Sequence, residues 1–165
     1  MNKRSLFFSV ATGVFMMLVF CLSSNAFSQT MPAFQMKLTN GKTFSSSQLT
    51  NQKPVIIIYF APDCEHCRLL MDELFKKISV FKNCQLIMAT FQPVSEVLWF
   101  EKKYQTAKYA NIKVGVEVPV FFFRNYYKLE HTPFTALFNK SRKLVASYKE
   151  KTPVDELIKK VKALN

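Results

Sequence analysis

An unbroken apolar segment that leads into two closely spaced cysteines constrains this chain more than any other feature. Residues 55–60 read Val-Ile-Ile-Ile-Tyr-Phe, and an apolar run of this length is typical of a strand buried on both faces. Pro62 follows, where it ends the strand and redirects the chain. From Cys64 through Cys67 onward, apolar residues recur at helical spacing. The pattern predicts a strand that delivers two cysteines to the first turn of a helix.

Two thiols in this position suit thiol–disulfide exchange. The N-terminus of a helix carries partial positive charge from its unpaired N–H groups, and this charge favours the thiolate form of Cys64. If the pKa of that thiol fell from about 8.5 to about 7, the thiolate fraction at neutral pH would rise from roughly 3% to about half. Cys67 lies one turn along on the same helix face, within reach of a mixed disulfide formed at Cys64.

The N-terminal residues have the pattern of a secretory signal. Lys3 and Arg4 supply the positive region, and the 17 residues 6–22 are almost wholly apolar. Ala26-Phe27-Ser28 then offers small residues at the positions that a signal peptidase recognises, which predicts cleavage before Gln29.

Cleavage at that point leaves one domain of residues 29–165. The alternative to a cleaved signal peptide over residues 1–28 is an uncleaved anchor, because the 17 apolar residues 6–22 are at the lower limit for spanning a bilayer. In both cases the sequence predicts an exported, periplasmic protein, either soluble or tethered to the inner membrane by residues 6–22. A membrane is a partner only in the uncleaved case.

Export changes the meaning of the cysteine pattern. In an oxidising compartment a Cys-x-x-Cys pair cycles or stays oxidised, whereas in the cytosol it would favour metal binding. Removal of residues 1–28 leaves three cysteines, so Cys84 has no partner within the motif. Its place at the start of an apolar segment predicts a small buried core thiol. The alternative is a third redox role or an intermolecular role.

The chain is basic, with a formal net charge of +12. Residues 1–28 hold two basic residues and no acidic ones, so the charge without them is +10. The lysines are spread along the sequence without forming a single stripe, and no nucleic-acid-binding motif accompanies them. We therefore expect a solvated surface and no nucleic-acid partner. A weak, salt-sensitive attraction to anionic lipid or acidic partners is the alternative.

The rest of the chain alternates strand and helix patterns, which predicts an α/β fold with a mixed central sheet covered on both faces. Asn40-Gly41 between two short apolar segments predicts a leading hairpin. The other predicted elements are a helix from Cys64, a strand over 86–91, a helix capped by Ser95, an extended segment over 112–120, a short buried helix over 121–127, strands over 134–138 and 144–148, and a last helix capped by Thr152 with Pro153 at its first position.

This order, with Thr132-Pro133 entering a late strand, resembles the thioredoxin fold. The signal and the leading hairpin resemble the TlpA/ResA-like branch of extracytoplasmic thiol–disulfide oxidoreductases, which is related in fold to the AhpC/TSA peroxiredoxins. The most specific segments are residues 60–67 and 127–134. The resemblance covers residues 31–164 and implies a thioredoxin-like three-layer sandwich with an N-terminal β-hairpin extension.

The resemblance also implies roles for individual residues. Cys64 is the attacking thiol and Cys67 the resolving thiol, while Pro133 is the cis-proline that packs against the disulfide. The backbone of Thr132 then pairs with an extended substrate segment beside the cysteines, as a short form of strand addition. Pro62 completes this surface.

Several positions depart from the thioredoxin pattern. Asp63 stands where thioredoxins have a tryptophan and is expected to contact substrate, and Glu65-His66 replaces Gly-Pro between the cysteines. A protonated His66 favours the Cys64 thiolate, whereas Asp63 and Glu65 oppose it. Ile58 occupies the position of a buried acid, so proton removal from the second cysteine must use water or another group. The balance leaves the redox direction open, and the resemblance favours a reductase.

The resemblance implies protein thiols and disulfides as partners, an upstream membrane electron donor, a monomeric state and no cofactor. Two alternatives start from the same cysteines. One is copper binding by Cys64, Cys67 and His131, although His131 is otherwise expected on a loop surface and no second zinc-type motif is present. The other is a non-catalytic thioredoxin-fold interaction module. Peroxidase activity is disfavoured because the threonine-rich peroxidatic signature is absent before Cys64.

Overall fold

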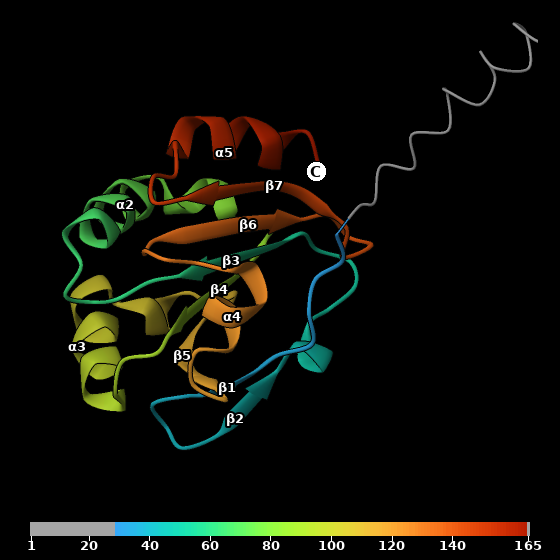
Figure 1. The fold of residues 1–165 in the computed structure, drawn as a ribbon. Coiled ribbons are helices and arrows are strands. Elements are labelled where there is room, and N and C mark those ends of the chain that lie inside the picture. The colour runs from blue at the N-terminus through green and yellow to red at the C-terminus, as the bar shows by residue number, and fades with distance from the viewer. Residues whose placement is uncertain (1–28, 165) are drawn as a thin grey trace, which may run out of the picture.

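The computed structural model describes residues 29–164, which build one seven-stranded mixed sheet (Figure 1). The three central strands β5, β4 and β3 are parallel, and the flanking pairs are antiparallel. The strand order is β2-β1-β5-β4-β3-β6-β7. The strands are β1 (Gln35–Lys37), β2 (Thr43–Ser45), β3 (Val55–Tyr59), β4 (Gln85–Thr90), β5 (Ile112–Val118), β6 (Phe134–Phe138) and β7 (Leu144–Lys149).

Helices cover both faces of this sheet, which confirms the predicted layered α/β architecture. Three longer helices, α2 (Glu65–Lys76), α3 (Val94–Tyr104) and α5 (Val154–Lys162), pack on one face. The short helix α4 (Phe122–Tyr127) packs on the other face together with the β1–β2 hairpin. Single turns of 3-10 helix complete the chain at η1 (Ser46–Gln48), η2 (Ile78–Phe81) and η3 (Thr106–Lys108).

The apolar run of β3 separates two hydrophobic clusters. Ile56 and Ile58 point into the cluster beneath α2, α3 and α5, whereas Ile57 and Tyr59 point into the cluster beneath α4. Because successive side chains of a strand point to opposite faces, a strand with helices on both sides needs apolar residues at every position. The unbroken apolar sequence is therefore explained by the position of β3 inside the sheet.

Two predicted helix caps are wrong. Helix α3 begins at Val94 with Pro93 at its N-cap, so Ser95 lies inside the first turn. Proline suits this boundary because its fixed φ fits a helix start and it has no N–H to satisfy. Helix α5 has Pro153 at its N-cap. Thr152 is buried, and its hydroxyl instead pairs with the Thr135 hydroxyl at 2.7 Å.

The aromatic segment before β6 forms the short helix that the sequence predicts. Phe123 and Tyr127 are buried against β3 and β6, whereas Phe121 and Tyr126 are 40% and 41% exposed. Packing in the core thus explains the aromatic residues on the buried face of α4 and not those on its exposed face.

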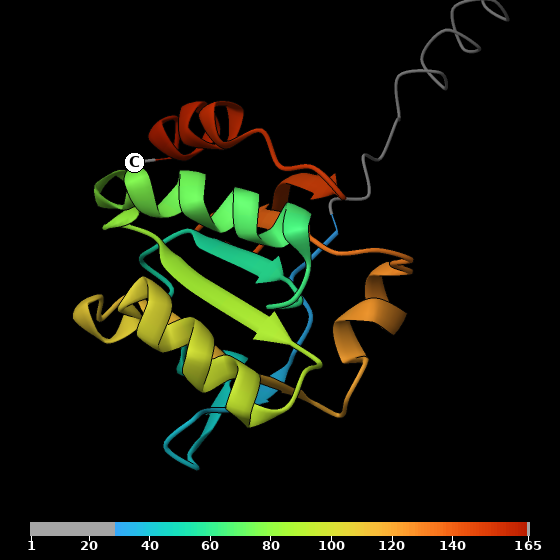
Figure 2. The same ribbon diagram turned by 90° about the vertical axis from the view of Figure 1, so that its left-hand side faces the viewer.

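The topology brings two distant segments to the same end of the sheet. Strand β3 ends at Tyr59, and the chain then turns into α2 through the loop that carries Cys64. Strand β6 runs antiparallel to β3 and pairs Phe134 with Tyr59, so the residues just before β6 lie beside that loop. Figure 2 views the molecule from this side, with α2 and α3 in front of the sheet.

The predicted signal or anchor over residues 1–28 lies outside the described residues. Among residues 29–164, no helix combines the length and the apolar character that a bilayer span requires.

Candidate active site

Cys64 is the N-cap residue of α2. Its backbone is extended, with φ −78° and ψ 125°, and its sulfur accepts the backbone N–H of Cys67 at 3.3 Å. The carbonyl of Cys64 accepts the N–H of Arg68 at 3.0 Å, which closes the first helical turn. The sulfur therefore lies where unpaired N–H groups converge, and such a position favours negative charge. The predicted strand–cysteine–helix unit is present.

The two thiols differ in environment. Cys64 is partly exposed, whereas Cys67 is 1% exposed. Burial alone would raise the pKa of Cys64, but hydrogen bonds from the side chains of Cys67 and Thr132 and from the backbone N–H groups of Cys67 and His66 outweigh it, so this pKa is lowered. Burial raises the pKa of Cys67 to about 12. One sulfur is thus prepared to be a thiolate at the surface, and the other is held as a buried thiol.

The loop before β6 lies directly beside Cys64. The Cys64 thiol donates a hydrogen bond to the carbonyl of Thr132 at 3.5 Å. The peptide bond between Thr132 and Pro133 is cis, which is the geometry that the family resemblance implies. Pro133 is buried and Thr132 is partly buried. The structure therefore places these residues and Cys64 together.

Two hollows flank this contact. The first, here called the Arg124 pocket, has a volume of about 280 Å³. The second, here called the Leu69 groove, has a volume of about 420 Å³ and lies between α2 and the loop after β7. The Arg124 pocket is lined by Tyr59, Cys64, Phe91, Arg124, Leu129, Glu130, His131 and Thr132. The Leu69 groove is lined by His66, Leu69, Leu70, Glu73, Pro133, Glu150, Lys151 and Thr152.

The other predicted site residues surround Cys64 at different depths. Asp63, Glu65 and His66 are exposed, and Pro62 is buried. The carbonyl of Asp63 accepts a hydrogen bond from the Arg68 guanidinium at 3.0 Å, so that its backbone is held against α2. Both carboxylates stay in solvent, where their effect on the thiolate is screened.

His131 and Cys84 have different surroundings. His131 is exposed and lies on the wall of the Arg124 pocket. Cys84 is fully buried in the cluster beneath α2, α3 and α5, which matches the expected core thiol. Its burial raises its pKa to about 11. Among residues 29–164, no three histidine, cysteine or acidic side chains are grouped closely enough to hold a metal ion.

Sequence reasoning missed Glu117, a fully buried carboxylate near the site. It accepts hydrogen bonds from the Tyr59 hydroxyl at 2.9 Å and from the backbone N–H groups of Phe121 at 2.9 Å and Phe123 at 2.7 Å. Burial raises its pKa, although these hydrogen bonds act in the opposite direction. Tyr59 also lines the Arg124 pocket. The available signal was a single acid in the apolar segment Val114-Gly115-Val116-Glu117-Val118.

A mixed sheet whose central strand leads into a Cys-x-x-Cys helix start, with a proline loop against the first sulfur, defines a thioredoxin-like domain. The model of the AhpC/TSA family matches residues 27–161, and the chain belongs to this family. No protein among the curated proteins matches the sequence.

Solved structures share the fold. A protein from Bacteroides thetaiotaomicron that is assigned as a protein disulfide isomerase has a TM-score of 0.68 and 22% identity over 83% of this chain and 88% of its own. A secreted Mycobacterium tuberculosis disulfide oxidoreductase has a TM-score of 0.65 and 17% identity over 79% and 96%. The exposed lipoprotein thioredoxin of Streptococcus pneumoniae has a TM-score of 0.59 and 20% identity over 81% and 100%.

Proposed function

We propose that this protein is a thiol–disulfide oxidoreductase that reduces or exchanges protein disulfides outside the cytoplasm through Cys64 and Cys67. The observation that carries the proposal is the contrast between the two sulfurs. Cys64 is accessible, caps the helix and has a lowered pKa, whereas Cys67 is buried one turn away with a raised pKa. A reaction that begins at one thiolate and ends at the second thiol needs this asymmetry.

The first step is attack by the Cys64 thiolate on a client disulfide. The S–S bond of the client breaks, a mixed disulfide forms at Cys64, and the released client sulfur takes up a proton. Cys67 then loses its proton and attacks the sulfur of Cys64. The Cys64–Cys67 disulfide forms, and the second client sulfur leaves as a thiolate. Two electrons pass to the client, so a thiol reductant such as a membrane electron donor must regenerate the dithiol.

The client approaches as an extended segment beside Thr132. Pro133 faces the Leu69 groove and Thr132 faces the Arg124 pocket. Residues on the two sides of the client cysteine therefore have separate places to bind, with backbone pairing at Thr132 between them. Pro62 and Asp63 contribute to the client-binding surface before Cys64, and Glu65 and His66 tune the thiolate from the first turn of α2.

The extracytoplasmic location rests on the signal pattern of residues 1–28, and we propose a monomer that acts on its clients one at a time. The Mycobacterium tuberculosis neighbour is itself a secreted protein.

The test is a trapping experiment with the Cys67→Ser variant. This variant can complete the first step and cannot resolve it, so it should accumulate a one-to-one mixed disulfide with a disulfide-bonded model protein. Mass spectrometry of the non-reduced complex should place the bond at Cys64. The parent protein should instead release reduced client and gain an internal Cys64–Cys67 bond.

Two matched variants make the result specific. Cys64→Ser should form no mixed disulfide, and Cys84→Ala should behave as the parent because the Cys84 sulfur is fully buried. If the Cys67→Ser variant traps no client and the parent never forms an internal bond in a glutathione redox buffer, the proposed reaction is wrong.

A further inference from the structure

The loops at the end of the sheet opposite Cys64 are uniformly basic. Strands β3, β4 and β5 all begin at this end, and the β6–β7 turn lies there too, as their registers show. Residues 50–55, 79–86, 105–113 and 139–144 contain none of the chain's 11 acidic residues. They carry seven basic ones, here called the basic end: Lys53, Lys82, Lys108, Lys113, Lys140, Arg142 and Lys143.

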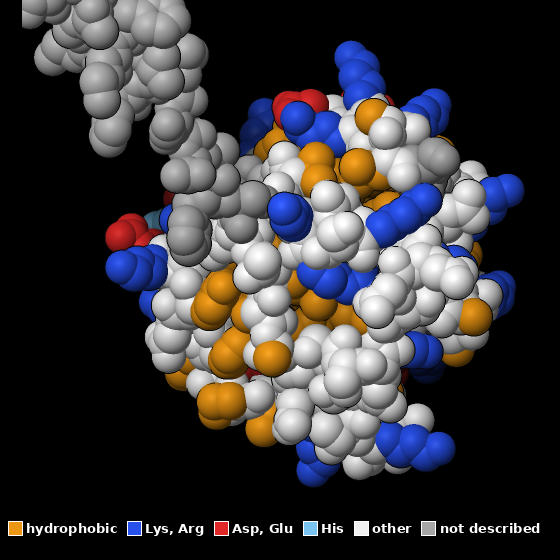
Figure 3. Space-filling model, turned by 90° about the vertical axis from the view of Figure 1, so that its right-hand side faces the viewer, with side chains coloured by type: hydrophobic (Ala, Val, Ile, Leu, Met, Phe, Trp, Pro, Cys, Tyr) orange, Lys and Arg blue, Asp and Glu red, His pale blue; other side chains and the backbone are white. Residues whose placement is uncertain are grey.

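The fold therefore gathers lysines that are dispersed in the sequence. Figure 3 looks at this side of the molecule and shows many blue side chains and few red ones. Five of the seven residues are exposed, namely Lys53, Lys82, Lys108, Lys140 and Lys143. No ion pair is formed by any of the seven, whereas the ion pairs among the described residues all lie on the helices of the other faces. The exposed lysines therefore direct their charge to solvent, whereas the guanidinium of Arg142 donates hydrogen bonds to the backbone carbonyls of Thr50 and Lys53.

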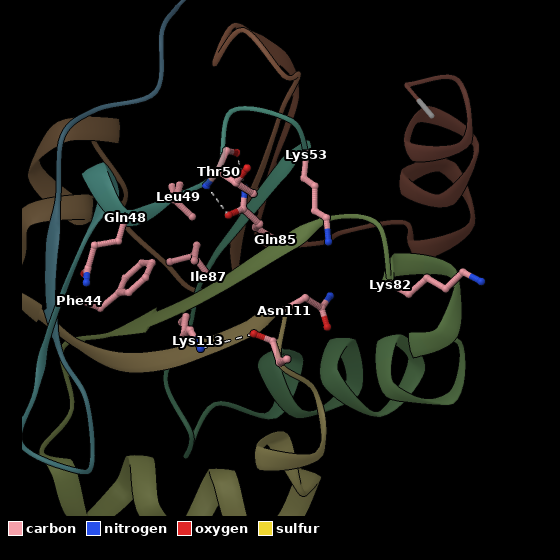
Figure 4. Close-up of a pocket in the computed structure, with 11 residues that line it drawn as sticks. Phe44, Gln48, Leu49, Thr50, Lys53, Lys82, Gln85, Ile87, Asn111 and Lys113 are labelled. Atoms are coloured by element: carbon pink, nitrogen blue, oxygen red, sulfur yellow. Dashed lines mark hydrogen bonds between the residues drawn. The ribbon is translucent and has the colours of Figure 1, made fainter.

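The basic end also contains a hollow of about 420 Å³. Lysines and apolar side chains are both among the residues that line it, and no acidic residue is. In Figure 4, Lys53 reaches over the hollow from the loop before β3, and Lys82 extends away from it. The residues that give it this mixed character are Lys53, Lys82, Lys113, Phe44, Leu49 and Ile87.

The chain enters the domain at this same end. The carbonyl of Gln29 accepts the N–H of Leu144 at 2.8 Å, and the N–H of Met31 donates to the carbonyl of Arg142 at 2.9 Å. In the sequence, the apolar segment 6–22 ends seven residues before Gln29. Seven residues span at most about 25 Å when extended. If that segment stays in a bilayer, the basic end is the part of the domain held beside the lipid surface.

We propose that the basic end docks on an anionic phospholipid surface, with its lysines on the lipid phosphates and the hollow receiving a headgroup. A lipid headgroup presents negative charge beside apolar chains, which matches a hollow lined by both lysines and apolar side chains. Each basic residue at an anionic membrane strengthens binding about five-fold, so the five exposed lysines together supply most of the attraction. Cys64, at the other end of the sheet, then points away from the membrane toward approaching clients.

The test uses the domain of residues 29–165, because the whole sheet and both hydrophobic clusters lie within it. Vesicles of phosphatidylcholine alone or with an equal amount of phosphatidylglycerol are sedimented with the protein in about 50 mM salt. We expect binding to the anionic vesicles only. Raising the salt to about 0.5 M should release the protein, since it shortens the range of the attraction.

A variant pair with matched loss of charge locates the surface. We expect vesicle binding to weaken about 100-fold when Lys53→Gln, Lys82→Gln and Lys140→Gln are combined. Each lost charge should weaken binding about five-fold, and the three factors multiply. The control removes three lysines at the Cys64 end, namely Lys128, Lys149 and Lys151, and should change binding less than about two-fold. Thermal melts establish that both triple variants are folded. If the variant at the basic end does not fold, the single variant Lys53→Gln takes its place.

Absence of binding to anionic vesicles at low salt would overturn the proposal, as would equal binding to both vesicle types. Equal weakening by the two triple variants would also overturn it, because binding would then depend on net charge and not on the basic end. None of these outcomes depends on the cysteines, so this test and the trapping experiment fail or succeed separately.

Discussion

The hydroxyl of Tyr59 donates a hydrogen bond of 2.9 Å to the carboxylate of Glu117, which lies 58 residues further along the chain. The same carboxylate accepts the backbone N–H groups of Phe121 and Phe123 at the start of α4. A buried charge is tolerated when donors of this kind surround it. The contact joins a wall of the Arg124 pocket to the segment that leads into α4.

Replacement of Glu117 by alanine should strongly destabilise the domain. It leaves three donors without their acceptor, two of them buried, and loss of one side of a buried charged network costs about 3–5 kcal/mol. Glu117→Gln retains an amide oxygen as acceptor and should cost about 1–2 kcal/mol. Urea unfolding followed by circular dichroism measures both. An alanine variant as stable as the parent would show that these hydrogen bonds contribute nothing net.

Glu117 should also leave a signature in the pH dependence of stability. Burial raises its pKa above the ordinary 4.5, so the folded state holds this proton more tightly than the unfolded state. Its contribution to stability is therefore present at low pH and is lost as pH rises from about 4.5 through the raised pKa. Urea unfolding of the parent and of Glu117→Gln between pH 4 and 8 should show that fall in the parent only. Parallel curves would contradict it.

The sequence contains the local part of the site but not its distant contacts. The route from β3 through Cys64 into α2 follows from adjacent residues, because an apolar run and a helical repeat each have their own period. The Glu117 network depends on a partner on another strand, and no local pattern identifies that partner. Thr152 was misassigned as a helix cap for the same reason, since its hydroxyl partner Thr135 lies 17 residues away.

The grouping of charge also depends on the topology. Lys53, Lys82 and Lys140 are far apart in sequence, and they share one end of the sheet because β3 and β4 begin there and the antiparallel strand β6 ends there. A linear search for a basic stripe therefore finds none. The topology converts scattered lysines into one surface, while the acids at positions 63 and 65 lie beside Cys64.

Alkylation should distinguish the three thiols of the domain. Iodoacetamide should modify Cys64 fastest, and the pH of its half-maximal rate should lie below the 8.5 of an ordinary cysteine, because hydrogen bonds lower its pKa despite burial. Cys67, with a pKa of about 12, and the buried Cys84 should stay unmodified at pH 8. Peptide mass spectrometry after timed quenching measures each site. A Cys64 rate no faster than that of an unfolded control would show an unactivated thiol.

Glu65→Gln should make the couple more oxidising. Glu65 is exposed in the first turn of α2 beside Cys64, and its negative charge opposes the thiolate. Its removal stabilises the reduced form, which raises the potential by an amount on the order of 10 mV for a screened surface charge. Equilibration with glutathione buffers measures the change, and Glu96→Gln in the first turn of α3 is the matched control. A lowered potential would mean that Glu65 acts by another route.

Cys84→Ala should lower the stability of the domain slightly and leave its rate of disulfide exchange unchanged. The Cys84 side chain is fully buried in the cluster beneath α2, α3 and α5, and it belongs to neither the Arg124 pocket nor the Leu69 groove. Loss of its sulfur leaves a small cavity, which should cost about 1 kcal/mol in the free energy of unfolding. The rate of disulfide exchange should stay within about two-fold of the parent, because the sulfurs at Cys64 and Cys67 keep their surroundings. Urea unfolding and a disulfide-reduction assay on the same preparation test both statements. A large loss of exchange with normal stability would instead assign Cys84 a redox role that its burial does not suggest.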